Sequence, residues 1–381
     1  MRADKIGAMT KRVGVIGGGQ LARMMIAPAS ELGLEIRVLA EQEGMSAQLA
    51  ATQVGDYTDL ETVRAFVKDV DVVTFDHEHV PQDVLRALVA DGVQVHPGPD
   101  ALQYAQDKLV MRAKLAEAGV PQPDWAGVAS RDELQSFLDD HGGRAVVKTP
   151  RGGYDGKGVR VVSSGADADD WFEAFAGEQI LVEELVDFRR ELAQQVARRP
   201  SGQMIVYPVV ESVQKDGVCA EVFAPAPGAS ERAIEVAAQI GTQIAESLGV
   251  TGMLAVELFE TSDERLLVNE LAMRPHNSGH WTQDGAVTSQ FEQHLRAVCD
   301  LPLGATDTLR DAACMINILG GPQGVDIDER FAVAMQAYPA AKIHTYGKAS
   351  RPGRKVGHIN VADDDLDEAV YTARAAAAFF A

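Results

Sequence analysis

The sequence lacks the features that would place it in a membrane or on a nucleic acid. No apolar run approaches the roughly 20 residues that span a bilayer, and the N-terminal stretch MRADKIGAMTKR has no apolar signal core. Lys and Arg number 35 against 56 Asp and Glu, which gives a formal net charge of −21. This balance argues against general affinity for nucleic acids or anionic membranes, because both require an excess of basic residues. We therefore expect a cytoplasmic protein whose partners are small molecules.

Cysteine is scarce and no internal repeat is visible. The three cysteines, Cys219, Cys299 and Cys314, are scattered without a CxxC pair, which indicates a reducing compartment and argues against a thiolate metal site. The length of 381 residues suggests two or three domains.

Strands alternate with helices between residues 12 and 98. The predicted strands are Val13–Ile16, Ile36–Leu39, Val70–Phe75 and Val93–Val95. Three helices are predicted between these strands. The first begins near Gln20 and ends before Gly33, the second begins at a capping box made by Thr58 and Glu61, and the third covers Pro81–Ala90. Such alternation predicts a doubly wound parallel sheet of the α/β class.

The rest of the chain has α+β character. A helical pattern over Asp100–Gly119 precedes short strands with few helices between them, which predicts antiparallel hairpins. These strands are Ala145–Lys148, Val159–Val162, Ile180–Glu183, Met204–Val210, Leu254–Phe259 and Leu266–Glu270. Further on we expect a helix at Glu231–Leu248, strands at Cys314–Leu319 and Lys342–Tyr346, and a helix at Leu366–Phe380. We predict three domains, at residues 1–105, 106–300 and 301–381.

A glycine loop follows the first predicted strand. The run from Gly17 to Ala22 fits GxGxxA between a strand and a helix, and Glu41 stands where a dinucleotide fold places its ribose-binding acid. A helix N-terminus beside glycines binds anions, so the loop favours a phosphate-type ligand over an unliganded turn. An NAD-dependent oxidoreductase remains an alternative at this point.

A second glycine loop, residues 148–158, lies between two predicted strands. A Walker A loop needs GxxxxGK[ST] opening a helix, so this loop is of another kind. Its backbone amides could close over phosphates while Lys148 reaches the phosphate oxygens as a point charge. The alternative is a mobile surface hairpin.

Paired acids indicate a metal site. Glu257 and Glu270 lie on two strands joined by a predicted turn at Thr261–Glu264, so antiparallel pairing would place the two carboxylates side by side. Two carboxylates with the Asn269 amide are hard ligands suited to magnesium. The alternative is a pair of solvated acids at a sheet edge, which the apolar neighbours disfavour.

Two donor-rich runs indicate oxyanion binding. The first is Arg274-Pro275-His276-Asn277-Ser278-Gly279-His280-Trp281, where proline and glycine argue against a helical His pair for a metal. The second places Lys348, Arg351, Arg354 and Lys355 within eight residues, which stands out as a phosphate receptor in so acidic a chain. By contrast, the acidic residues between Glu183 and Glu191, taken alone, indicate only the exposed end of a strand.

Together these elements resemble the ATP-grasp superfamily and, within it, the 5-(carboxyamino)imidazole ribonucleotide synthetases of purine biosynthesis. The resemblance covers nearly the whole chain in order. It is carried by the strings GGGQLARM (17–24), GGYDGKG (152–158), EELVDFRRE (183–191), VNELAMRPHNSGHWTQ (268–283), SQFEQHLRA (289–297) and RPGRKVGH (351–358). It implies a Rossmann-like N-terminal domain (the pre-ATP-grasp domain), a central ATP-grasp domain and a small C-terminal domain.

The resemblance also implies a reaction and a set of roles. ATP would phosphorylate bicarbonate, and the amine of aminoimidazole ribonucleotide would take the carboxyl group. The ATP residues would be Lys108, Lys148, the loop Gly153, Tyr154, Asp155, Gly156, Lys157 and Gly158, the hinge Glu183, Glu184, Leu185 and Val186, then Glu191, Gln214, Asn269 and Glu270. Magnesium would lie on Glu257 and Glu270. The groups around bicarbonate would be Arg274, His276, Asn277, Ser278 and Lys355. The ribonucleotide residues would be Gln20, Leu21, Glu78, Tyr154, Asp155, Lys348, Arg354 and Lys355.

The sequence departs from the family pattern at two positions. Gln214 stands where many relatives have an ATP-contacting His, and Lys108 replaces a frequent Arg, which keeps the charge and loses bidentate geometry. The resemblance implies a homodimer. The alternatives are another carboxylate–amine ligase of the superfamily and a non-catalytic nucleotide sensor, against which the retained Lys148, Glu257 and Glu270 argue.

Overall fold

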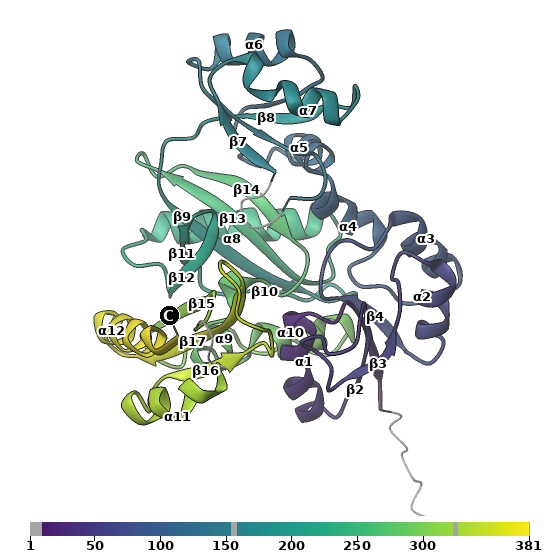
Figure 1. Ribbon diagram of the computed structural model, residues 1–381, viewed down its shortest axis with the longest axis vertical. Helices are drawn as coiled ribbons and strands as arrows, with labels where there is room; N and C mark the ends of the chain where they lie inside the picture. The colour runs from purple at the N-terminus through teal and green to yellow at the C-terminus, as the bar shows by residue number, and fades with distance from the viewer. Residues whose placement is uncertain (1–9, 154–157, 323–326, 381) are drawn as a thin grey trace, which may run out of the picture.

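The computed structural model describes residues 10–153, 158–322 and 327–380, which form three β-sheets with helices packed around them (Figure 1). The first sheet is parallel, with the strand order β3 (Ala51–Val54), β2 (Glu35–Ala40), β1 (Arg12–Ile16) and β4 (Val72–Phe75). Its helices are α1 (Gln20–Glu31), α2 (Leu60–Val67) and α3 (Gln82–Ala90). β4 is buried along its whole length, as expected for a sheet covered on both faces. The Rossmann-like N-terminal domain is confirmed.

Three details of this domain differ from the sequence prediction. β3 has an alternating, half-exposed pattern and was not predicted. The segment Val93–Val95 contributes only an isolated bridge between Val95 and Val73. The predicted capping box at Thr58 is wrong, because Asp59 directly precedes α2 and its carboxylate accepts from the Thr62 backbone N–H at 2.9 Å.

The second sheet is small and antiparallel. Its strand order is β5 (Trp125–Val128), β8 (Ile180–Glu184), β6 (Ala145–Lys148) and β7 (Val159–Val162). Its helical segments are α6 (Arg131–Asp140), η1 (Gly165–Ala168) and α7 (Asp169–Ala174), and the unit lies at the top of Figure 1. Leu134, Phe137 and Leu138 of α6 pack with the sheet's apolar residues in one buried cluster. β6 and β7 flank the second glycine loop, as predicted.

The third sheet, counted over the described residues, has nine strands and runs through the centre of the molecule. Its order is β14 (Leu266–Ala272), β13 (Gly252–Thr261), β9 (Phe188–Arg198), β11 (Val210–Lys215), β12 (Val218–Ala224), β15 (Ala312–Leu319), β17 (Lys355–Asp363) and β16 (Lys342–Thr345), with β10 (Met204–Val206) paired to β9. The helices of this region are α8 (Glu231–Ser247), η2 (Asn277–Gly279), α9 (Thr282–Gly285), α10 (Gln290–Val298), α11 (Asp328–Ala337), α12 (Leu366–Ala377) and η3 (Ala378–Phe380). The sheet continues from the central region into the C-terminal one through pairing of β12 with β15. The exact domain boundaries stay a prediction.

Two predicted elements are divided in the structure. The helix predicted over Asp100–Gly119 is two helices, α4 (Pro99–Gln106) and α5 (Lys108–Glu117). Asp107 separates them in an extended conformation and caps α5 by accepting from the Leu109 and Val110 amides at 3.0 and 3.2 Å. The strand predicted over Met204–Val210 divides into β10 and β11 around Pro208, which has no N–H for the ladder.

None of the helices in residues 10–153, 158–322 and 327–380 is long and apolar enough to cross a membrane.

Candidate active site

A cleft of about 1990 Å³ lies where the three sheets approach one another. Of the predicted site residues, those lining it are Gln20, Leu21, Glu78, Lys108, Lys148, Gly153, Glu183, Glu184, Leu185, Val186, Glu191, Gln214, Glu257, Asn269, Glu270, Arg274, His276, Asn277, Lys348, Arg354 and Lys355. The predicted Tyr154, Asp155, Gly156 and Lys157 fall outside the described residues. Segments more than 300 residues apart in sequence therefore meet around one cavity, which is large enough for a nucleotide and a second substrate.

One end of the cleft is apolar. Val159, Val161, Leu185 and Phe188 are exposed large hydrophobic side chains, and all four line the cleft. The Phe188 ring stacks on Phe259 with 4.5 Å between the ring centroids. These side chains lie beside the predicted hinge, and an apolar slot there suits a planar base.

Lys148 is held in a closed ring of contacts with Glu183, Arg112 and Asn269. Its Nζ lies 2.7 Å from Glu183 Oε2 and donates to Asn269 Oδ1 at 3.0 Å. Arg112 Nε pairs with Glu183 Oε1 at 2.6 Å, and Arg112 Nη2 donates to the Asn269 carbonyl at 2.7 Å. Burial alone would raise the pKa of Glu183, but the charges of Lys148 and Arg112 hold it below its ordinary value. The Glu183 side chain therefore orients Lys148, and Arg112, which the sequence analysis missed, supports both.

Glu257 and Glu270 lie opposite each other on β13 and β14, in register as predicted. Burial, with repulsion from Glu270 and Glu191, raises the pKa of Glu257 to about 8. Lys108 Nζ lies 3.1 Å from Glu270 Oε1, at the start of α5 where the Asp107 break places it. Two facing carboxylates, one of which has a raised pKa, fit a divalent cation, which would relieve their repulsion.

Glu191 and Gln214 face the same part of the cleft from β9 and β11. Burial raises the pKa of Glu191 to about 7, against the lowering effects of Lys148 and of a hydrogen bond with Gln214. Gln214 Nε2 also donates to Ser212 Oγ at 2.9 Å. The residue that replaces the family's His thus contacts the predicted ribose acid.

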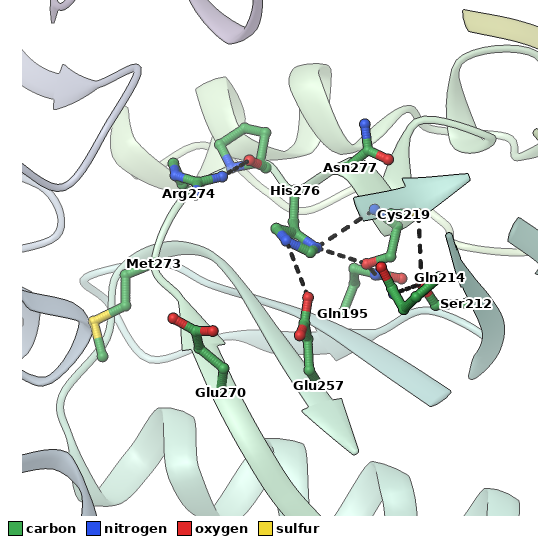
Figure 2. Close-up of polar contacts among 12 residues, drawn as sticks. Gln195, Ser212, Gln214, Cys219, Glu257, Glu270, Met273, Arg274, His276 and Asn277 are labelled. Atoms are coloured by element: carbon green, nitrogen blue, oxygen red, sulfur yellow. Dashed lines mark hydrogen bonds and ion pairs between the residues drawn. The ribbon is translucent and has the colours of Figure 1, made fainter. Parts of the chain in front are cut away.

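The donor-rich loop after β14 brings Arg274 and His276 over the paired acids (Figure 2). Arg274 Nε donates to Glu78 Oε2 at 2.7 Å, and His276 Nε2 lies 3.4 Å from Glu257 Oε1. Burial, with the charges of Arg274 and Lys355, holds the pKa of His276 well below its ordinary value. Asn277 exchanges side-chain amide hydrogen bonds with Asn317 of β15. The loop therefore presents donors directly beside the candidate metal carboxylates.

Ser278 lies behind His276, with its side chain buried. Its hydroxyl is 2.8 Å from His276 Nδ1 and accepts from Gln195 Nε2 at 2.7 Å. Ser278 therefore acts on the cleft through the imidazole of His276, which lines it. Gln290 holds the same loop, because its amide accepts from the His276 N–H at 2.9 Å and donates to the His276 carbonyl at 2.8 Å.

The sequence analysis assigned no role to either glutamine. Gln290 belongs to the string SQFEQHLRA, which could have marked it. Gln195 lies inside β9, a strand that was not predicted as such.

The first glycine loop meets the C-terminal basic run, as expected for a shared site. Lys348 Nζ donates to Gln20 Oε1 at 2.7 Å. The Gly18 N–H donates to Glu41 Oε2 at 3.0 Å, and the Ala22 N–H donates to Asp76 Oδ1 at 2.7 Å. These carboxylates occupy amides that a pyrophosphate would need, which argues against the NAD alternative. Positive charge for a phosphate would come from Lys348, Arg354 and Lys355, which line the same cleft.

Family models match three successive parts of the chain. They are a ribonucleotide synthetase preATP-grasp domain at residues 9–106, an ATP-grasp domain at 113–291 and a phosphoribosylaminoimidazole carboxylase C-terminal domain at 313–372. These matches confirm the three predicted kinds of domain.

Similar proteins match over nearly the whole chain. The N5-carboxyaminoimidazole ribonucleotide synthase of Mycobacterium tuberculosis is 52% identical over 96% of this chain and 86% of its own. That of Corynebacterium ammoniagenes is 47% identical over 96% and 91%.

Solved structures agree with these relatives. The synthetase from Thermus thermophilus has a TM-score of 0.87 and 35% identity, covering 97% of this chain and 98% of its own. The Aspergillus clavatus enzyme, solved with ADP and 5-aminoimidazole ribonucleotide, has a TM-score of 0.87 and 31% identity, with coverage of 97% and 98%. The chain belongs to the N5-carboxyaminoimidazole ribonucleotide synthase family of ATP-grasp proteins.

Proposed function

We propose that this protein carboxylates 5-aminoimidazole ribonucleotide with bicarbonate at the expense of ATP, giving N5-carboxyaminoimidazole ribonucleotide, ADP and phosphate. The observation that carries the proposal is one cleft lined by an apolar slot, two lysines beside paired carboxylates, an oxyanion loop and a basic run. A base, its phosphates, bicarbonate and a sugar phosphate each need one of these four features, and all four line one cavity.

At the nucleotide end, Leu185 and Phe188 enclose adenine and Glu191 accepts from the ribose hydroxyls. Lys108 and Lys148 contact the phosphates, and Gly152 and Gly153, which also line the cleft, offer them backbone amides. The Lys148–Glu183–Arg112 arrangement holds the lysine in place before ATP binds. Phosphoryl transfer depends mainly on positioning and charge neutralisation, which these groups supply.

Glu257, Glu270 and Asn269 would hold magnesium. The fit rests on their hard oxygen ligands and on the raised pKa of Glu257. Within the described residues no cluster of three or more His, Cys, Asp or Glu forms a self-sufficient metal site, so the remaining ligands would be water and phosphate oxygens. When bound, the ion would neutralise charge on the transferred phosphoryl group.

At the middle of the cleft, Arg274, His276 and Asn277 bind bicarbonate. An oxygen of bicarbonate attacks the γ-phosphorus of ATP, the bond to the β-phosphate oxygen breaks, and ADP leaves. The product is carboxyphosphate, whose enclosure in the cleft protects it from water. The exocyclic amine of the ribonucleotide then forms a bond to the carboxyl carbon, phosphate departs, and the amine loses a proton.

At the far end, Gln20, Leu21 and Glu78 bind the ribonucleotide together with Lys348, Arg354 and Lys355, and Glu78 also accepts from Arg274. One helix N-terminus offers only about half a unit of positive charge. A phosphate of charge near −2 in a protein of net charge −21 therefore needs these further cations.

An ATPase assay with each component omitted tests the proposal. We expect ADP release only when both bicarbonate and the aminoimidazole ribonucleotide are supplied, with stoichiometric formation of the carboxylated product. Glu270→Gln keeps the side-chain shape but removes a charge that the cation needs, and it should lose nearly all turnover while the fold survives. ADP release that is the same with and without the ribonucleotide would indicate another ligase of the superfamily.

We also propose that the protein acts as a cytoplasmic homodimer, which the family resemblance supports. Light scattering of the purified chain at several concentrations tests the dimer. A single mass near the 40.8 kDa of one chain would contradict it.

A further inference from the structure

The His276 ring has a polar neighbour at each nitrogen. Ser278 Oγ lies 2.8 Å from Nδ1, and Glu257 Oε1 lies 3.4 Å from Nε2. The Ser278 backbone N–H also points at Nδ1, at 3.4 Å. An imidazole nitrogen that accepts from an N–H cannot carry a proton itself. At 3.4 Å this bond is long, so it favours an unprotonated Nδ1 and leaves the decision to the Ser278 hydroxyl.

Gln195 fixes the direction of the same chain of hydrogen bonds. Its Nε2 donates to Ser278 Oγ at 2.7 Å, and both side chains are almost fully buried. A hydroxyl that accepts from the amide keeps its own proton to donate elsewhere. The Ser278 proton then lies on the line to His276 Nδ1, so the ring proton is on Nε2 and faces Glu257.

We propose that Gln195 is a positioning residue that, through Ser278, holds His276 as the Nε2–H tautomer, so that His276 donates a hydrogen bond to bicarbonate or carboxyphosphate and does not act as a base. The proposal rests on the proposed function for the identity of the anion. The backbone of His276 is fixed separately by Gln290, so the ring direction is left to Gln195 and Ser278.

The tautomer is measured directly by nitrogen–proton correlation spectra of the full chain with ¹⁵N-labelled histidine at neutral pH. His276 is assigned by the signal lost in His276→Gln. We expect the Nε2–H pattern in the unsubstituted protein and the Nδ1–H pattern in Gln195→Glu, because a carboxylate only accepts and would take the Ser278 proton. An Nδ1–H pattern in the unsubstituted protein overturns the proposal, whether or not the Gln195→Glu variant folds.

Kinetics with a matched control separate positioning from packing. Gln195→Leu should raise the KM for bicarbonate about tenfold, as for one lost hydrogen bond, and leave the KM for ATP unchanged. Gln194 is the neighbouring buried amide, and it donates to the backbone carbonyls of Tyr207 and Gln195, at 2.6 and 3.0 Å, and not to Ser278. Gln194→Leu should spare the KM for bicarbonate, although it loses two buried hydrogen bonds of its own.

Equal effects of the two substitutions on bicarbonate would overturn the proposal. An unsubstituted protein that does not couple ATP to bicarbonate would instead refute the proposed function, and the spectra would still decide the tautomer.

Discussion

Glu191 is the residue on which the placement of the nucleotide depends most. It is buried beside Lys148 and bonded to Gln214, and it is the predicted acceptor for the ribose hydroxyls. We expect Glu191→Ala to raise the KM for ATP about tenfold, because two hydroxyl donors lose a charged acceptor. Leu185→Ala should raise it only a few-fold, because the hinge recognises adenine through backbone groups and loses only apolar contact area. Isothermal titration with a non-hydrolysable ATP analogue measures both, and an unchanged affinity in Glu191→Ala would mean that the nucleotide binds elsewhere.

Arg354 and Lys355 test the opposite end of the cleft. Burial, with the charge of Arg351, lowers the pKa of Arg354. A bound anion would therefore stabilise the charged guanidinium at this position. Arg354→Ala or Lys355→Ala should raise the KM for the ribonucleotide at least tenfold and spare that for ATP. Arg310→Ala is the control, since Arg310 pairs with Asp364 at 2.9 Å and does not line the described cleft. Equal increases in the KM for the ribonucleotide and the KM for ATP would contradict a dedicated phosphate site.

At the scale of single elements, the turn η2 depends on Gly279. A Cβ at this position would lie 2.4 Å from Gln290 Oε1, the atom that accepts from the His276 amide. Gly279→Ala should displace that amide, lower the free energy of unfolding by about 1–3 kcal/mol and raise the KM for bicarbonate. Gly98→Ala is the control, because its new methyl group would meet nothing closer than 3.8 Å. Thermal unfolding and initial-rate kinetics measure the pair, and equal destabilisation would show that the close approach does not matter.

Elements with a strong local pattern were predictable, and elements defined by tertiary pairing were not. Three elements, β1, β6 and α8, match their predicted ranges to within a residue or two. The two strands have continuous apolar runs and the helix has a regular apolar stripe, and both patterns are visible in the sequence. β9 was missed because its middle carries Gln194 and Gln195, whose amides are polar in sequence but buried in the sheet.

The candidate site shows the same division. The order of its motifs predicted which segments meet around the cleft. Arg112, Asp76 and Gln195 were missed because each acts on another protein group, and that partner is known only once the chain has folded. Asp76 alone left a usable signal, since it directly follows a buried strand.

At the scale of the whole molecule, His294 joins the N-terminal domain to the central sheet. Its Nε2 lies 2.7 Å from Thr74 Oγ1 of β4, and its Nδ1 accepts from the Met253 N–H of β13 at 3.0 Å. Burial, with the charge of His96, lowers its pKa from 6.5 to about 3. At acidic pH the folded state therefore binds fewer protons at His294 than the unfolded chain does. The contribution of this neutral, buried His294 to the free energy of unfolding is fully present above pH 6.5 and is lost as the pH falls toward 3.

The His294→Gln variant should remove this dependence on pH. Gln can hydrogen-bond both neighbours without titrating, so its free energy of unfolding should fall less steeply than that of the unsubstituted protein. The difference in slope should be up to about 1.4 kcal/mol per pH unit. Chemical unfolding curves collected between pH 6 and 4 measure it, and parallel pH profiles would show that His294 titrates normally.

The pairing of β12 with β15 bears on how the chain can be handled as fragments. A cut at residue 300 would separate these strands and leave each piece with an open edge of backbone N–H and C=O groups, four residue pairs long. Unprotected sheet edges of this kind recruit other chains, so either fragment alone should precipitate or form mixed oligomers. Co-expression of the two pieces should restore a soluble complex, because each supplies the strand that the other lacks.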